Sequence, residues 1–104
     1  MKVFEKEKLG LFNPKETTEN DKIEKITKLV ILGEQIIGKP VRVKTGKDIM
    51  VVSQVTVGIE SVGNNTTLAR YVISINCLRF NKNHQQYISE RFNERVLEEI
   101  EECI

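Results

Sequence analysis

The amino-acid sequence predicts an α+β protein in which a three-stranded antiparallel meander stands between two helices. Apolar residues recur at helical spacing over residues 18–38, alternate with polar residues over 41–78, and return to helical spacing over 83–102. Each predicted helix has a single apolar stripe, so both helices are expected on the same sheet face. Residues 18–104 should therefore form one α-β-β-β-α domain, and a chain of 104 residues suffices for a modest core.

The segment before this domain, residues 1–17, is expected to be an arm or a short edge strand. Phe4, Leu11 and Phe12 are apolar residues in a charged segment. Asn13-Pro14 stops any helix there. These three side chains should attach the arm to the domain.

The first predicted helix begins at Thr18 or Asn20, which can cap it, and ends at Gly38, two residues before a proline that cannot continue a helix. Acidic residues near its start favour the positive end of the helix dipole. Its inward stripe is expected to contain Ile23, Ile26, Leu29, Val30, Gly33, Ile36 and Ile37. Lysines occupy the opposite side.

Dense β-branched residues with a period of two predict strands between residues 41 and 78. The odd-numbered residues expected to point inward are Val41, Val43, Ile49, Val51, Val55, Val57, Ile59, Tyr71, Ile73, Ile75 and Cys77. Pairing Val57 with Tyr71 leaves Gly63-Asn64-Asn65 as a three-residue loop. Such a loop ends at positive φ, which asparagine tolerates.

The same loop matches the N-glycosylation pattern at Asn64 and Asn65. Residues 1–8 mix both signs of charge without an apolar segment, so no secretory signal is expected. We therefore interpret the loop as a turn and expect a cytoplasmic protein. Cys77 and Cys103 show no paired spacing, which is typical of a reducing compartment.

The last helix is predicted over residues 83–102. Its inward stripe would contain Tyr87, Ile88, Phe92, Val96, Ile100 and Cys103. Glu90, Glu94, Glu98 and Glu102 would form a carboxylate stripe. A carboxylate metal site needs facing acids and a Glu-x-x-His motif, so no metal is expected. Because acidic side chains in the last turn oppose the helix dipole, the end should fray or meet a basic surface.

Residue patterns for catalysis are missing from the sequence. His84 could act as a general base, but no serine or cysteine nucleophile has a recognisable companion, so an exposed residue is the preferred interpretation. The glycines form no phosphate-binding motif. We expect no enzyme activity, no cofactor and no catalytic residues, and no apolar run approaches the length of a membrane span.

The predicted element order resembles that of double-stranded-RNA-binding domains. The resemblance is limited to topology, because the segment NKNHQQYISERF has one lysine where those domains have a lysine-rich start of the last helix. Net charge is +1, with an excess of base over residues 1–89 and of acid over 90–104. Nucleic-acid binding is therefore predicted to be weak at physiological salt.

The remaining candidate is the sheet face away from the helices, where even-numbered side chains point outward. We predict a partner-binding surface of Arg42, Met50, Val52, Gln54, Arg70, Val72 and Leu78. A protein partner or a second copy of the chain would bind there, and Met50→Asp or Leu78→Asp should disrupt the complex without unfolding the monomer. The alternative is a nucleic-acid-binding module using Arg42, Lys44, Lys47 and Arg70.

Abundant lysine, asparagine and isoleucine with no tryptophan suggest an AT-rich bacterial or phage genome. Small regulatory, accessory or inhibitory proteins of this size are common in such genomes. The sequence thus favours a small non-catalytic protein that acts by binding.

Overall fold

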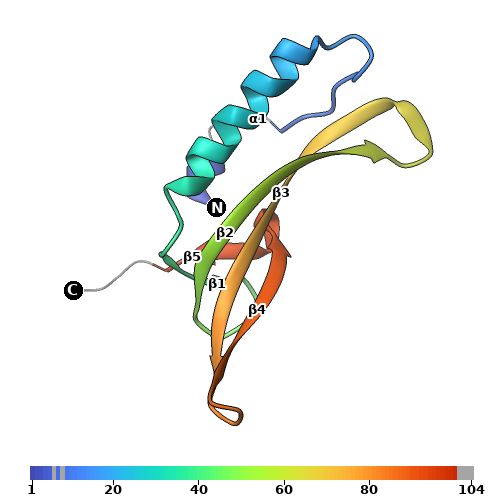
Figure 1. Ribbon diagram of the computed structural model, residues 1–104. Helices are drawn as coiled ribbons and strands as arrows, with labels where there is room; N and C mark the ends of the chain where they lie inside the picture. The colour runs from blue at the N-terminus through green and yellow to red at the C-terminus, as the bar shows by residue number, and fades with distance from the viewer. Residues whose placement is uncertain (6, 8, 101–104) are drawn as a thin grey trace.

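A computed structural model describes residues 1–5, 7 and 9–100 of the chain (Figure 1). One α-helix, α1 (Glu19–Glu34), precedes five antiparallel strands with the spatial order β4-β3-β2-β1-β5. The strands are β1 (Pro40–Val43), β2 (Met50–Val62), β3 (Asn65–Asn81), β4 (Gln86–Asn93) and β5 (Leu97–Glu99). Two 3-10 helices, η1 (Lys2–Phe4) and η2 (Glu94–Val96), complete the described elements. The predicted α+β class is confirmed, whereas the three-stranded meander with two helices is wrong.

Helix α1 follows the prediction closely. The Thr18 side chain accepts a hydrogen bond from the backbone N–H of Asp21 and caps the helix. Leu29, Gly33 and, just beyond the helix, Ile36 are buried. A Cβ at Gly33 would lie 2.6 Å from Cγ1 of Val55, so the missing side chain lets α1 approach β2 closely. Ile23 and Ile37, predicted to point inward, are exposed.

The segment predicted as the last helix forms β4, η2 and β5 instead. Ile88 and Phe92 are four residues apart, a spacing that puts two side chains on one side of either a helix or a strand. β3 supplies a partner for the whole of β4 in an unbroken register from Asn81↔Gln86 to Ser74↔Asn93. Backbone pairing with β3 therefore decides between the two periods. Tyr87 and Val96, expected inside, are exposed, and Leu97 is fully buried instead.

A β-bulge at Ser53 divides β2 into two parts with opposite parity. Val52 pairs with Cys77 and Gln54 pairs with Asn76, so Ser53 has no residue opposite. After the bulge Val55 and Val57 are half-buried as predicted, whereas Ile59, also expected inside, is exposed. Before it the parity is reversed, because Met50 and Val52 are buried while Ile49 and Val51, both expected inside, are exposed.

The β2–β3 hairpin is also confirmed, with a different register and turn. Val57 pairs with Ile73 rather than Tyr71, a shift of two residues that leaves each side chain on its predicted face. A second irregularity precedes Val62, which pairs with Asn65 across a two-residue turn. Gly63 has φ of +60°, so glycine supplies the positive φ that was expected of asparagine.

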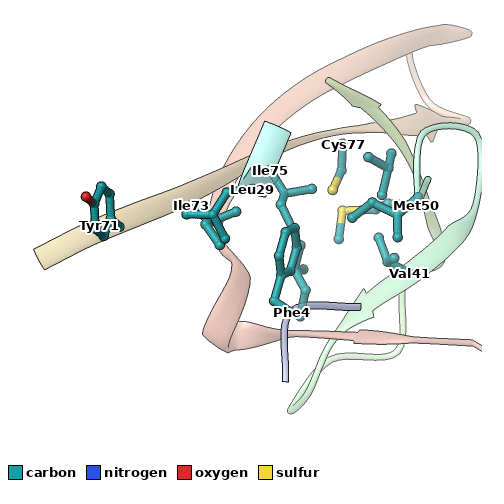
Figure 2. Packing of buried hydrophobic residues seen from close by; sticks show 11 residues of the cluster. Phe4, Leu29, Val41, Met50, Tyr71, Ile73, Ile75 and Cys77 are labelled. Atoms are coloured by element: carbon teal, nitrogen blue, oxygen red, sulfur yellow. The ribbon is translucent and has the colours of Figure 1, made fainter. Parts of the chain in front are cut away.

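The core lies between α1, the N-terminal arm and the inner face of the sheet, the face that contacts α1. Phe4 of η1 is 3% exposed and packs with Leu29, Ile75 and Met50 (Figure 2). Leu97 of β5 belongs to the same cluster, so both ends of the described chain contribute to one core. The β2–β3 and β3–β4 hairpins extend from it at opposite ends (Figure 1).

Candidate interaction surface

The outer face of the sheet, opposite α1, is left uncovered by the described part of the N-terminal arm. Phe12 forms a backbone bridge with Ala69, and its ring stacks on Tyr71 with centroids 4.6 Å apart. Tyr71 belongs to the inner-face core, as does Phe4. The arm therefore packs through Phe4 and Phe12 as predicted, on the inner side, while Leu11 is exposed.

Four large apolar side chains are exposed at one end of this outer face. Val51 pairs with Leu78 across β2 and β3, and Phe80 pairs with Tyr87 across β3 and β4. Leu78 and Phe80 are two residues apart on one strand and so share a face. We call Val51, Leu78, Phe80 and Tyr87 the apolar patch; their exposed fractions are 43%, 37%, 50% and 70%.

The two aromatic rings of the apolar patch contact each other. Their centroids are 5.3 Å apart with planes inclined by 59°, a favourable tilted arrangement. Because Phe80 and Tyr87 are opposite each other on neighbouring strands, the contact also fixes their position on the sheet. The patch thus presents a preordered aromatic surface to solvent.

A hydrogen-bonded row of polar side chains crosses three strands beside the apolar patch. The amide nitrogen of Asn76 donates to Oε1 of Gln54 over 3.3 Å. Nε of Arg91 donates to Oδ1 of the same asparagine, also over 3.3 Å. Three side chains from β2, β3 and β4 are therefore held in one line, and only Arg91 among them is charged.

The predicted basic residues of the outer face are engaged by carboxylates. Arg42 forms an ion pair with Glu98 across β1 and β5, and Arg70 forms one with Glu60 across β2 and β3. Exposed pairs of this kind contribute roughly 0–1 kcal/mol to stability. Their main effect here is to neutralise the two arginines. Lys44 and Lys47 are exposed near the β1–β2 turn.

Two predicted surface residues are not on the outer face. Met50 and Val52 are 3% and 1% exposed and belong to the core, because the bulge at Ser53 reverses their parity. Met50→Asp would consequently be expected to unfold the protein, so it cannot serve as the proposed surface test. Gln54 and Leu78 are exposed, and Val72 is half-buried.

Sequence reasoning missed Val51, Phe80 and Tyr87. Phe80 continues the even-numbered alternation of Leu78, so extending the predicted strand by two residues would have found it. Tyr87 was assigned to the inward stripe of a helix that does not exist. Val51 was assigned inward because the bulge left no clear sign in the sequence.

The carboxylates of the predicted acidic stripe have separate partners. Glu90 accepts from Arg79 over 2.7 Å, Glu98 pairs with Arg42, and Oε2 of Glu94 lies 3.3 Å from the N-terminal amine of Met1. Glu102 lies outside the described residues. With no α-helix there, neither a frayed helix end nor a carboxylate stripe arises between residues 86 and 99.

A cavity of about 140 Å³ lies on the inner side, beside the β1–β2 turn. Arg79 lines it and contacts Glu90 over 2.7 Å and Asp48 over 3.4 Å, so its charge is balanced. Ligand sites usually enclose roughly 300–1,000 Å³. This cavity is smaller, and the charged groups of Arg79, Glu90 and Asp48 in its lining contact one another.

Neither candidate catalytic side chain has a suitable environment. Cys77 is fully buried, and burial, followed by the nearby Glu90 carboxylate, raises the pKa of its thiol to about 11. His84 lies exposed in the turn of residues 82–85 rather than at the start of a helix. Cys103 lies outside the described residues.

The described residues contain neither a metal-binding group of side chains nor a membrane-spanning helix. No three His, Cys, Asp or Glu side chains there are grouped to hold a metal ion. No helix in the same part of the chain has the length and apolar character to cross a bilayer. A scan against protein-family models, a search of curated proteins and a search of solved structures found no match to the chain.

Proposed function

We propose that the protein is a small, non-catalytic regulatory protein that binds another protein through the apolar patch. The observation that carries this proposal is the exposed, mutually contacting pair of Phe80 and Tyr87 on an open sheet face. Aromatic residues are enriched in protein interfaces and supply much of their binding energy. An exposed aromatic cluster of this kind is best explained by a surface that becomes buried.

The size of the cluster supports a partner rather than incidental exposure. At 50% and 70% exposure, Phe80 and Tyr87 present on the order of 250 Å² of surface between them. Val51 and Leu78 extend this surface across β2 and β3. Contiguous apolar patches of a few hundred Å² on a monomer are frequently functional.

The surroundings of the apolar patch define the chemistry of its partner. Ser89 pairs with Leu78, and the amides of Asn76 and Gln54 lie farther along the same face, so the side chains bordering the patch are mostly neutral and polar. A complementary protein would bring apolar side chains to the patch centre and hydrogen-bonding groups to its rim. This is a different arrangement from the predicted surface centred on Met50 and Val52.

Affinity capture with matched variants tests the proposal. Tagged wild-type protein is used to isolate a bound protein from cells of the source organism, which is then purified. Its affinity is compared for Phe80→Ser, Leu78→Asp and the control Ile31→Asp, which alters an apolar residue 54% exposed on α1. Loss of binding in the first two variants with retention in the control supports the patch. Equal affinity for all three folded variants contradicts it.

Single-stranded nucleic acid is a second candidate for the same surface. Bases stack on exposed aromatic side chains of open sheets, and Phe80 with Tyr87 offers such a surface beside Arg91. Arg42 and Arg70 are each neutralised, which lowers the expected phosphate affinity. Fluorescence anisotropy with a labelled single strand at two salt concentrations tests this candidate. Tight, salt-dependent binding abolished by Phe80→Ser would place it first.

A further inference from the structure

The whole of β4 forms one edge of the sheet among the described strands. Gln86–Asn93 pairs with β3 on one side, and no described segment pairs with it on the other. The opposite edge is formed by β5, which is only three residues long, and by the part of β2 beyond Val52, which β1 does not pair with and which has a bulge at Ser53 and a second irregularity before Val62. Short edge strands are one common protection against unwanted pairing, and β4 lacks that protection.

Of the other common protections of an edge strand, β4 has two charged side chains, Glu90 and Arg91, but lacks the rest. It contains neither lysine nor proline, and its register with β3 has no bulge. Its inward-pointing charge, Glu90, is compensated by Arg79 within the chain. The edge is therefore regular and accessible over eight residues.

We propose that two copies of this chain associate through β4, antiparallel and about a two-fold axis at Ser89. This inference goes beyond the proposed function, because it concerns the strand edge rather than the face. Paired β4 strands would join the two sheets into one continuous ten-stranded sheet. A two-fold interface of this kind is the commonest form of homo-oligomer.

The residues of β4 select this register. Tyr87, Ser89 and Arg91 lie on the outer face and Ile88, Glu90 and Phe92 on the inner face, since their β3 partners do. A continuous sheet must pair outer with outer residues, so the axis has to pass through a residue and not between two. Axes at Glu90 or Arg91 would place like charges directly opposite each other, which is destabilising.

An axis at Ser89 avoids like charges and pairs residues 86–92 of both copies. It places Tyr87 opposite Arg91 of the second copy, twice by symmetry. Tyr87 is 70% exposed, and Arg91 donates a hydrogen bond to the neutral Asn76 side chain without a carboxylate partner among the described residues. Each such pair allows a cation–π contact. An axis at Ile88 also avoids like charges, but it pairs only residues 86–90.

Pairing at the edge leaves most of the outer face accessible. The second copy lies beside β4 and not above the sheet, so Leu78 and Phe80 remain uncovered. The dimer would thus carry two apolar patches on one continuous surface. A partner with two binding segments could engage both patches, and such bivalent binding strengthens association.

Charge reversal at the axis provides the main test. Sedimentation equilibrium of the full chain should show a dimer whose dissociation constant rises at least about fivefold in Ser89→Glu and in Ser89→Lys, because identical charges meet at the axis. An equimolar mixture of the two variants should restore the wild-type affinity. The control is Thr56→Glu, an exposed outer-face position on β2, which β3 separates from β4, and it should leave the dimer unchanged.

Cross-linking tests the register. In chains carrying Cys103→Ser, Ser89→Cys places two thiols at the axis, where opposite Cβ atoms lie about 4.5–5.5 Å apart and a disulfide is attainable. Arg91→Cys separates them by about 13 Å along the strands and should not cross-link. Cross-linking of Arg91→Cys instead, or of neither variant, overturns the register.

A wild-type chain that sediments as a monomer at all concentrations overturns the dimer itself. That result would leave the proposed function intact if the apolar patch still binds a partner. Conversely, a confirmed Ser89 dimer with no effect of Phe80→Ser on partner binding would remove the proposed function and keep this inference.

Discussion

The two faces of the sheet are built from the same strands but differ in what determines their residues. The inner face contacts α1 and the arm, and its side chains, such as Ile75 and Cys77, are fully buried. The outer face has no covering layer among the described residues, yet it carries Leu78 and Phe80 on the same strand. Contacts with α1 and the arm account for the apolar side chains of the inner face. The outer face carries apolar side chains that no such contact among the described residues accounts for.

The largest expected difference between the faces is at the adjacent residues Val51 and Val52. Val52→Asp buries an unpaired carboxylate and should lower the free energy of unfolding by about 3–5 kcal/mol or more. Val51→Asp, at the exposed patch, should cost no more than about 1 kcal/mol. Urea denaturation of both variants measures the difference. Similar losses would mean that Val51 and Val52 do not point to opposite faces of the sheet.

A smaller effect is expected where α1 contacts the inner face. Gly33→Ala introduces a Cβ 2.6 Å from Cγ1 of Val55. Overpacking, partly offset by the better helix propensity of alanine, should cost about 1–2 kcal/mol. Adding Val55→Ala should remove most of the clash, giving a favourable coupling energy in denaturation experiments.

Gly58→Ala is the matched control for that experiment. Gly58 pairs with Val72 on the outer face, and a Cβ there would have no atom within 4 Å. The free energy of unfolding of the Gly58→Ala variant should equal or exceed that of the wild type. A loss as large as that of Gly33→Ala would contradict the difference between the covered and uncovered faces.

Within the apolar patch the effect on folding should be smaller still. Tyr87→Ser removes the ring contact with Phe80 and should lower the free energy of unfolding by about 0.5–1 kcal/mol. Partner binding and dimerisation should suffer more, because both use the exposed ring. Thermal unfolding compared with the binding measurements separates the two effects. A severe loss of stability would indicate that the ring supports the hairpin itself.

The smallest effect concerns the contact of the arm with α1. Hydrogen bonds from Lys25 and Lys28 to Glu7 hold the pKa of its carboxyl below its ordinary value near 4.5. A lowered folded-state pKa stabilises the fold above that ordinary value, and the contribution is lost as the pH falls through the lowered pKa. Glu7→Gln should therefore melt slightly below the wild type at neutral pH and equally in strong acid.

The control for this pH dependence is Glu16→Gln, which alters an exposed carboxyl in the same arm. Its melting temperature should follow that of the wild type throughout the titration. If the Glu7→Gln difference persisted unchanged into strong acid, the ion pairs with Lys25 and Lys28 would not be its cause.

Local pattern was sufficient for α1 and for the central part of the sheet. Thr18 was a recognisable cap, and the alternation from Val55 to Cys77 identified the buried face correctly even though the register was two residues off. A shift by two preserves the face of every side chain, so a face can be predicted without the pairing. Gly63 was expected in the turn, but the positive φ was predicted for the asparagine that ends the loop and is found at Gly63 instead.

The C-terminal third could not be predicted from local pattern, because two periods fit it equally well. Ile88 and Phe92 satisfy both, and the deciding term is backbone pairing with β3, which is distant in sequence. The wrong assignment of this segment to a helix also made the predicted binding surface incomplete. Leu78 was found, but Phe80 was left outside the strand and Tyr87 was placed in the wrong element.

The bulge accommodates one extra residue in β2, and the inward-facing side chains on either side of it do not depend on that residue. Ser53 is exposed, and its hydroxyl donates a single hydrogen bond to the Asn76 carbonyl, so many replacements should be accepted there. Removing the residue should also be accepted, because Gln54 would then follow Val52 directly and Met50, Val52, Val55 and Val57 would share one face in uninterrupted alternation. In a library of variants, position 53 should therefore tolerate both substitution and deletion.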